Sequence, residues 1–410
     1  MRTFRDLLAT ALVAIAFVAI FEGGLRLAGV RYEYSFYESD PVLYTTYRPN
    51  AEGWEVKESE NFVRMNSHGM RDRERTVAAS TGTVRVALLG DSVVAATQVP
   101  FENTMGQVLE RRLNSAFSRS GRGFEVLNFA QGGNTLAQQH LMLRGRVWAF
   151  RPQIVVVFVT PITVPTASRK LDTVAAPKPF YVMRAGELIP DPRNRPPESS
   201  APEARRRNGI LKNLMNRYRL LLVLRQATDQ GLHKLKALRT VTRTASVGAA
   251  EFDANKSPMD IWFRPPASTD VHEAWQVAEG LLRVIAEDMR QHGAELWMAS
   301  IGPAVQENPD ARDRMAYLEA HGYGGGNYSE DRFETFAKGE GIPYIRLSPR
   351  LLAHAERHGV SVRGFFNTPP HQGHWNVEGN SAAAGIVGDE LLARSEALRR
   401  LREAGPRQER

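Results

Sequence analysis

Residues 84–100 read VRVALLGDSVVAATQVP. The run from residue 84 to residue 89 is apolar except for Arg85, and it ends in Gly90-Asp91-Ser92. Apolar runs without polar alternation are typical of strands that are buried on both faces of a parallel sheet. We therefore predict a strand over 84–89 and a turn that exposes the Ser92 hydroxyl at the carboxyl edge of the sheet, where open α/β sheets bind ligands.

The alternation of strands and helices continues along the chain and predicts an α/β domain with a parallel sheet between two helical layers. The further strands are expected at 125–128, 154–159, 295–299 and 343–345, and the helices at 104–114, 136–150, 274–292, 333–339 and 380–399. Three other segments flank or interrupt this domain of residues 81–400: an irregular extension with one short strand (31–80), an insertion with one helix at 210–224 (161–267) and a frayed tail (401–410).

Composition limits the possible functions. The 410 residues include no cysteine, which excludes disulfides, thiolate metal sites and a cysteine nucleophile. The net charge of +8 suits anionic lipid or acidic polysaccharide, and no nucleic-acid-binding motif is found. Basic residues gather between 201 and 246, where they form either a solvated helical face or a contact with anionic headgroups or a glycan.

The N-terminus predicts a membrane anchor over residues 1–30. Arg2 and Arg5 precede an apolar run over 7–21, and continuing to Ala28 gives the ~20 residues that a spanning helix needs. No small-x-small cleavage site precedes Glu22, which favours a retained signal anchor over a cleaved signal peptide. Arginines on the N-terminal side predict a single-pass protein of the bacterial inner membrane with its large domain in the periplasm.

Three segments contain residues that could take part in catalysis. Ser92 follows the first strand, and its amide lies at a helix start where an oxyanion can bind, although Asp and Ser are also common helix caps. Gly132-Gly133-Asn134 follows the second strand, where a glycine amide can donate to an oxyanion or simply adopt a positive φ. His374 follows Gly373 in a late loop and can serve as the base that a serine nucleophile requires.

The order of these residues resembles the SGNH/GDSL hydrolases. The similar segments are LLGDSVVAATQVPFENTMGQVLERRLN (88–114), VLNFAQGGNTLAQQ (126–139) and GHWNVEGNSAAA (373–384), and YRPNAEG, NSHGMRD and KPFYVMRAGELI resemble anchored bacterial members. The resemblance implies a flavodoxin-like three-layer sandwich, Ser92 as nucleophile, His374 as base and the amides of Ser92 and Gly133 as oxyanion donors. It implies ester substrates, often acyl groups on sugars, and neither metal nor cofactor.

Two departures from the family pattern leave the activity open. Thr160-Pro161 stands where the family has an oxyanion asparagine, and Gln372 and His371 stand where it has the acid that orients the histidine. Asn134, Thr160 and Trp375 are the candidate substrate-binding residues, although Trp375 also fits a packed core position. The chain is therefore predicted to be either an O-acyl esterase or O-acetyltransferase acting on envelope or exported carbohydrate, or a non-catalytic SGNH scaffold. The scaffold would bind carbohydrate without turnover or act as an accessory subunit of a membrane complex.

Overall fold

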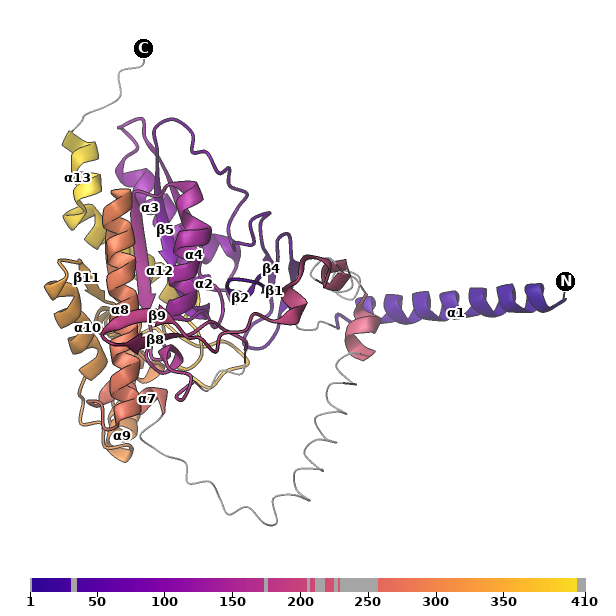
Figure 1. The fold of residues 1–410 in the computed structure, drawn as a ribbon. Helices are drawn as coiled ribbons and strands as arrows, with labels where there is room; N and C mark the ends of the chain where they lie inside the picture. The colour runs from indigo at the N-terminus through magenta and orange to yellow at the C-terminus, as the bar shows by residue number, and fades with distance from the viewer. Residues whose placement is uncertain are drawn as a thin grey trace.

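The computed structural model describes residues 2–30, 35–172, 176–204, 207–210, 218–224, 228 and 257–403. These residues form an α/β domain around a parallel sheet, and one long helix, α1 (Arg2–Leu27), extends away from it (Figure 1).

The central sheet has five parallel strands in the order β6-β5-β7-β10-β11. Their bounds are β5 (Thr83–Leu89), β6 (Gly123–Asn128), β7 (Ile154–Val159), β10 (Glu295–Ser300) and β11 (Tyr344–Arg346). Numbered along the chain, this order is 2-1-3-4-5, which is the flavodoxin-like arrangement. The predicted fold class is confirmed, and β7 has the predicted bounds because all six of its residues are buried.

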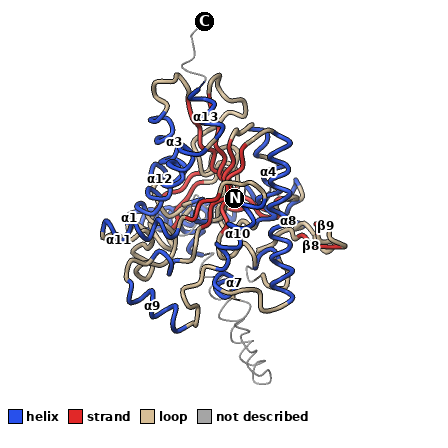
Figure 2. Tube along the Cα trace, turned by 90° about the vertical axis from the view of Figure 1, so that its left-hand side faces the viewer, coloured by secondary structure: helices blue, strands red, loops and turns tan. Residues whose placement is uncertain are grey.

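Helices cover both faces of the sheet (Figure 2). Ala87 and Leu89 of β5 face one hydrophobic core, whereas Val86 and Leu88 face the other, as the two-residue period of a strand requires. The first core holds α4 (Leu136–Gly145), α7 (Pro258–Phe263), α8 (Thr269–His292) and α10 (Tyr328–Gly339). The second holds α2 (Ser92–Ala95), α3 (Met105–Ala116), α11 (Ser348–His358), α12 (Val377–Arg394) and α13 (Glu396–Glu403).

Several elements differ from the predictions. The predicted closing helix is interrupted at Ser395, whose hydroxyl donates to Glu295 and accepts from the amide of Leu398. α11 and a surface helix, α9 (Ala311–Ala320), were not predicted. Within the predicted helix at 210–224 the described residues 210 and 219–224 are helical, whereas most of the basic run at 201–246 lies outside the described residues.

Three antiparallel hairpins stand outside the central sheet. Residues 31–80 were predicted to be irregular with one short strand, but they contain β1 (Tyr37–Asp40) paired with β2 (Tyr44–Tyr47) and β3 (Glu52–Glu55) paired with β4 (Asn61–Arg64). The insertion contains β8 (Tyr181–Arg184) paired with β9 (Glu187–Pro190). These strands have four residues each and no strict alternation of apolar and polar side chains, so the period-two pattern does not reveal them in the sequence.

Within the described residues, one helix segment, Phe4–Leu27, is long and apolar enough to cross a membrane. Only 6% of its most apolar window is buried, so α1 is not a core helix of the domain. Large apolar side chains such as Leu12, Ile15 and Ile20 are exposed along it.

Candidate active site

Ser92 lies on the turn between β5 and α2, at the carboxyl edge of the sheet. The Asp91 carboxylate caps α2 by accepting from the amide of Val93 (3.0 Å), and its other oxygen accepts from the Thr160 hydroxyl (2.9 Å). Gly90 has no room for a side chain, because a Cβ there would lie 2.7 Å from a methyl group of Val94. Packing and capping together fix the direction in which Ser92 points.

His374 reaches Ser92 from the loop that precedes α12. Its Nε2 lies 2.8 Å from the Ser92 Oγ, so the two residues, 282 positions apart in sequence, share a hydrogen bond. Nε2 as acceptor and the hydroxyl as donor is the arrangement that activates a serine nucleophile. The pairing of Ser92 with His374 that the sequence indicated is therefore present in the structure.

Glu58 supplies a carboxylate to the other side of His374. Its Oε1 lies 2.7 Å from His374 Nδ1, and its Oε2 accepts from the backbone amide of His374 (2.9 Å). Partial burial raises the pKa of Glu58, but the hydrogen bonds and charge of His374 outweigh it, so the pKa lies below its ordinary value. The carboxylate is thus ionised at neutral pH and positioned to stabilise an imidazolium.

Glu58 supplies the carboxylate that is missing at the family's position, two or three residues before His374. At the positions where the family has its acid, His371 contacts the Ser361 hydroxyl (2.8 Å), and Glu378, the acidic residue nearest to His374 in the sequence, contacts His354 (2.6 Å). Glu58 lies 316 positions before His374, so no local spacing in the sequence relates the two residues.

Glu58 is held in the loop between β3 and β4. The Glu55 carboxylate organises this loop by accepting from the amides of Lys57 (2.9 Å) and Ser59 (3.2 Å). The Ser59 hydroxyl also donates to the backbone carbonyl of Gln98 (2.6 Å), which docks the loop beside the segment that follows α2. Gly373 accommodates the carboxylate, since a Cβ at that position would lie 2.7 Å from its Oε2.

Donors for an oxyanion lie next to Ser92. The amide of Gly132 donates to the Tyr47 hydroxyl (2.9 Å), whereas the amide of Gly133 has no partner among the described residues. Asn134 is 4% exposed, and its side-chain Nδ2 has no partner in the described part of the chain. The amides of Ser92 and Gly133 and the Asn134 side chain are therefore the available donors.

Two of the candidate substrate-binding residues are occupied by other contacts. The Thr160 hydroxyl donates to Asp91 and is not available to replace the family's asparagine. Trp375 is 1% exposed, and its indole N–H donates to Glu307 (2.8 Å), so it is a core residue and not part of a glycan groove. Both expectations are corrected, because the bonded partners lie on elements that are distant in the sequence.

A pocket of about 340 Å³ opens beside Ser92. Asn134, a candidate substrate-binding residue in the sequence, is part of its lining. The walls of the pocket come from the edge of the sheet, the β1–β2 hairpin and the insertion. The lining residues are Tyr37, Thr45, Ser92, Gly132, Gly133, Asn134, Gln138, Ala176, Pro177 and Lys178.

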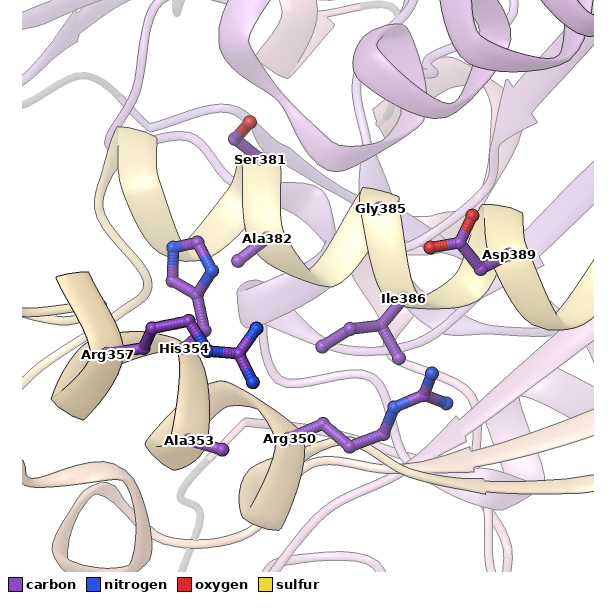
Figure 3. A pocket seen from close by; sticks show the side chains of 9 residues that line it. All are labelled: Arg350, Ala353, His354, Arg357, Ser381, Ala382, Gly385, Ile386 and Asp389. Atoms are coloured by element: carbon purple, nitrogen blue, oxygen red, sulfur yellow. The ribbon is translucent and has the colours of Figure 1, made fainter.

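A second hollow of about 510 Å³ lies between α11 and α12 (Figure 3). Three of the four titratable groups that line it have partners within the described ranges, with Arg357 as the exception: His354 pairs with Glu378, Arg350 with Glu390, and Asp389 with Arg112. None of the residues of the Ser92 site lines it, so its size does not make it the better candidate. Among the described residues, no group of three or more His, Asp or Glu side chains is arranged to hold a metal ion.

The fold and the site together define a flavodoxin-like α/β domain with a serine–histidine–glutamate relay at the carboxyl edge of its sheet. This strand order, with Ser92 after the first strand and His374 before the last long helix, agrees with the arrangement that the resemblance to the SGNH/GDSL hydrolases implied.

Comparisons with known proteins find similar solved structures at low sequence identity. No family model matches the chain, and no curated protein matches it. Solved structures that are similar include the acetyl xylan esterase AlAXEase (13% identity, 75% of this chain and 100% of that chain, TM-score 0.35). TesA is similar too (14% identity, 75% and 97%, TM-score 0.34), as is the two-domain esterase CEX, active on acetylated mannans (10%, 80% and 52%, TM-score 0.33).

Proposed function

We propose that this protein is a membrane-anchored serine O-acyl esterase or O-acetyltransferase that acts on acylated carbohydrate of the cell envelope or of an exported glycan. The observation that carries the proposal is the continuous relay from Ser92 Oγ to His374 Nε2 (2.8 Å) and from His374 Nδ1 to Glu58 (2.7 Å). Such a relay is recognised by its geometry and not by the order of its residues in the chain.

The chemistry follows from the positions of these groups. The Ser92 oxygen attacks the ester carbonyl while its proton passes to His374 Nε2, and Glu58 stabilises the imidazolium that forms. The carbonyl oxygen becomes an oxyanion, which the amides of Ser92 and Gly133 and the side chain of Asn134 bind. Collapse breaks the ester bond, and His374 protonates the departing alcohol. His374 then deprotonates water or a sugar hydroxyl, which attacks the acyl-enzyme. When this second intermediate collapses, the proton returns from His374 to Ser92, and the acyl group leaves.

The membrane-anchored location rests on α1. Its exposed apolar side chains would be covered by lipid, and the arginines at its N-terminal end favour a cytoplasmic N-terminus with the domain in the periplasm. At the other end, Glu22 accepts from the backbone amide of Leu220 (2.9 Å). This contact between helix and insertion favours a retained anchor over a cleaved signal peptide.

The alternative of a non-catalytic scaffold or accessory subunit of a membrane complex was motivated by the absence of an orienting acid and of an oxyanion side chain. Glu58 now occupies the position of the acid, and the Nδ2 of Asn134 lies at the pocket without a partner among the described residues. Both motivations are therefore weakened, and the esterase or transferase is the function that the geometry favours.

The test is labelling of the full-length protein, in mild detergent, with a fluorophosphonate. We expect labelling of the native chain, none with Ser92→Ala, and at least ~10³-fold slower labelling with His374→Ala, since members of such a unit fail together. Ser381→Ala is the matched control, because Ser381 is an exposed serine in the second hollow. A well-folded native chain that does not react would refute the proposal and restore the scaffold.

A further inference from the structure

The pocket is close to the anchor along the chain. α1 ends at Leu27, and the amide of Val30 still donates to the carbonyl of Leu25 (3.1 Å). Tyr37, which lines the pocket, follows Val30 by seven residues. Because an extended chain spans at most ~3.3–3.6 Å per residue, the Cα atom of Tyr37 lies within ~25 Å of that of Val30.

The insertion makes a second connection to the same end of α1. Glu22 is 8% exposed and accepts from the amide of Leu220 (2.9 Å) and from Arg26 (2.7 Å). Arg219 donates to the carbonyls of Leu25 (3.0 Å) and Arg26 (3.3 Å), which also accept from the amides of Val30 and Gly29 at the end of α1. We call this set of contacts the anchor clasp (Glu22, Leu25, Arg26, Arg219 and Leu220).

The two segments that are tied to the anchor also form walls of the pocket. The Thr45 hydroxyl of the β1–β2 hairpin donates to the carbonyl of Pro177 in the insertion (3.2 Å). The Tyr37 hydroxyl donates to the carbonyl of Gly132 (3.3 Å) at the edge of the sheet. Strands β1, β2 and β4 lie between the central sheet and α1 (Figure 1). The side of the domain that carries the pocket therefore faces the anchor.

The lining of the pocket restricts the acyl group. Its lining combines hydroxyl, amide and glycine positions with the Tyr37 ring, Ala176, Pro177 and Lys178, and its described residues include no Leu, Ile, Val or Phe that would form a long aliphatic slot. A long acyl chain needs an apolar slot, since each buried methylene contributes ~0.8 kcal/mol. The pocket thus fits a short acyl group on a polar, hydroxyl-bearing molecule.

We propose that the substrate is itself attached to the membrane: a short-chain O-acyl ester on a polar headgroup or glycan whose other end is a lipid in the same bilayer. The inference rests on the proposed function and on α1 as its membrane anchor. A site whose wall residue Tyr37 is tied within ~25 Å of Val30, just beyond the end of the anchor helix, meets such a substrate at an effective concentration in the millimolar range, whereas a free glycan has no such advantage.

The test uses the full-length protein in vesicles of phosphatidylethanolamine and phosphatidylglycerol. One probe is a methyl fluorophosphonate joined by a hydrophilic spacer of ~30 Å to a dialkylglycerol lipid, a length that matches the reach of the chain. The other probe is the same fluorophosphonate and spacer without the lipid. We expect the lipid-linked probe to label Ser92 at least ~10²-fold faster at equal bulk concentration.

A variant separates proximity from reactivity. Thirty flexible residues inserted after Val30 lengthen the tether by about 30 Å, and Glu22→Ala with Arg219→Ala in the same variant removes the side-chain contacts of the anchor clasp. We expect the advantage of the lipid-linked probe to fall several-fold, with labelling by the soluble probe unchanged. Equal labelling of the native chain by both probes, or an advantage unaffected in the variant, overturns the inference and leaves the proposed function standing. Labelling by neither probe overturns the proposed function itself.

Discussion

Replacing Glu58 by glutamine is the most direct test of the relay. Glutamine keeps the size of the side chain but offers only one oxygen, whereas Glu58 accepts from both Nδ1 and the backbone amide of His374. If the oxygen keeps the backbone amide, the amide NH₂ faces Nδ1 and forces the proton onto Nε2. The imidazole then cannot take the proton of Ser92, which is the wrong-tautomer effect known from serine proteases.

The magnitude follows from the exposure of the site. The corresponding substitution in a buried serine-protease triad costs ~10⁴ in kcat. The side chains of His374 and Glu58 are 23% and 20% exposed, so water can partly replace the carboxylate. We therefore expect kcat/KM to fall by ~10³, equivalent to ~4 kcal/mol, with KM nearly unchanged.

The assay is hydrolysis of a p-nitrophenyl ester of a short acid by the full-length chain in detergent, with fluorophosphonate labelling in parallel. Glu52→Gln is the matched control, because Glu52 lies on the same hairpin but forms only an exposed ion pair with Arg64. The reasoning fails if Glu58→Gln retains activity within a factor of about three of the native chain while Ser92→Ala is inactive, since the orienting effect is worth orders of magnitude.

Three further outcomes follow from the same contacts. Asn134→Ala should lower kcat by ~10²–10³, as loss of one oxyanion donor does, and a kcat equal to that of the native chain would contradict this. Thr160→Val should change the free energy of unfolding and leave kcat nearly unchanged. Trp375→Phe should cost ~1–3 kcal/mol in denaturant unfolding, because the acceptor on Glu307 loses a donor, with KM unchanged; a raised KM at native stability would instead indicate a substrate contact. Because the pKa of Glu58 lies below its ordinary value in the folded state, its contact stabilises the fold above about pH 4.3 and is lost as the pH falls through the folded-state pKa. Urea titrations of the native chain and Glu58→Gln should thus differ most above about pH 4.3 and converge as the pH falls below it, and a pH-independent difference would contradict this.

The central sheet could be predicted from the sequence because its strands are buried on both faces. The run 154–159 has no polar residue, and such a run has few alternatives in an α/β chain. Ser92 and His374 were found for a related reason: each adjoins an element whose pattern is strong, and the carboxyl edge of a parallel sheet is where a site forms.

Glu58 could not be found in this way. It lies between two four-residue strands in a segment without periodicity, and Glu52, Glu55 and Glu60 are nearby in the sequence. What distinguishes Glu58 is the docking of its loop against the loop that carries His374, and that contact spans 316 positions. Thr160 differs from Glu58, because its place after a strong strand pattern made it a candidate for substrate binding. Its hydroxyl instead donates to Asp91, a contact that no local pattern in the sequence indicates.

The departure from the family pattern at Gln372 and His371, where the family has its acid, has one structural consequence. The carboxylate comes from the β3–β4 hairpin, whose Asn61 side chain donates to the buried carbonyls of Thr97 (2.8 Å) and Val99 (2.7 Å) near the turn that holds Ser92. The relay therefore depends on a segment that precedes the α/β alternation and connects it to α1. Residues 35–64 are then part of the reactive unit and not only a spacer between the anchor and the domain. Any movement of residues 35–64 relative to the sheet would displace the catalytic acid and a wall of the pocket together, since Glu58 and Tyr37 both belong to this segment.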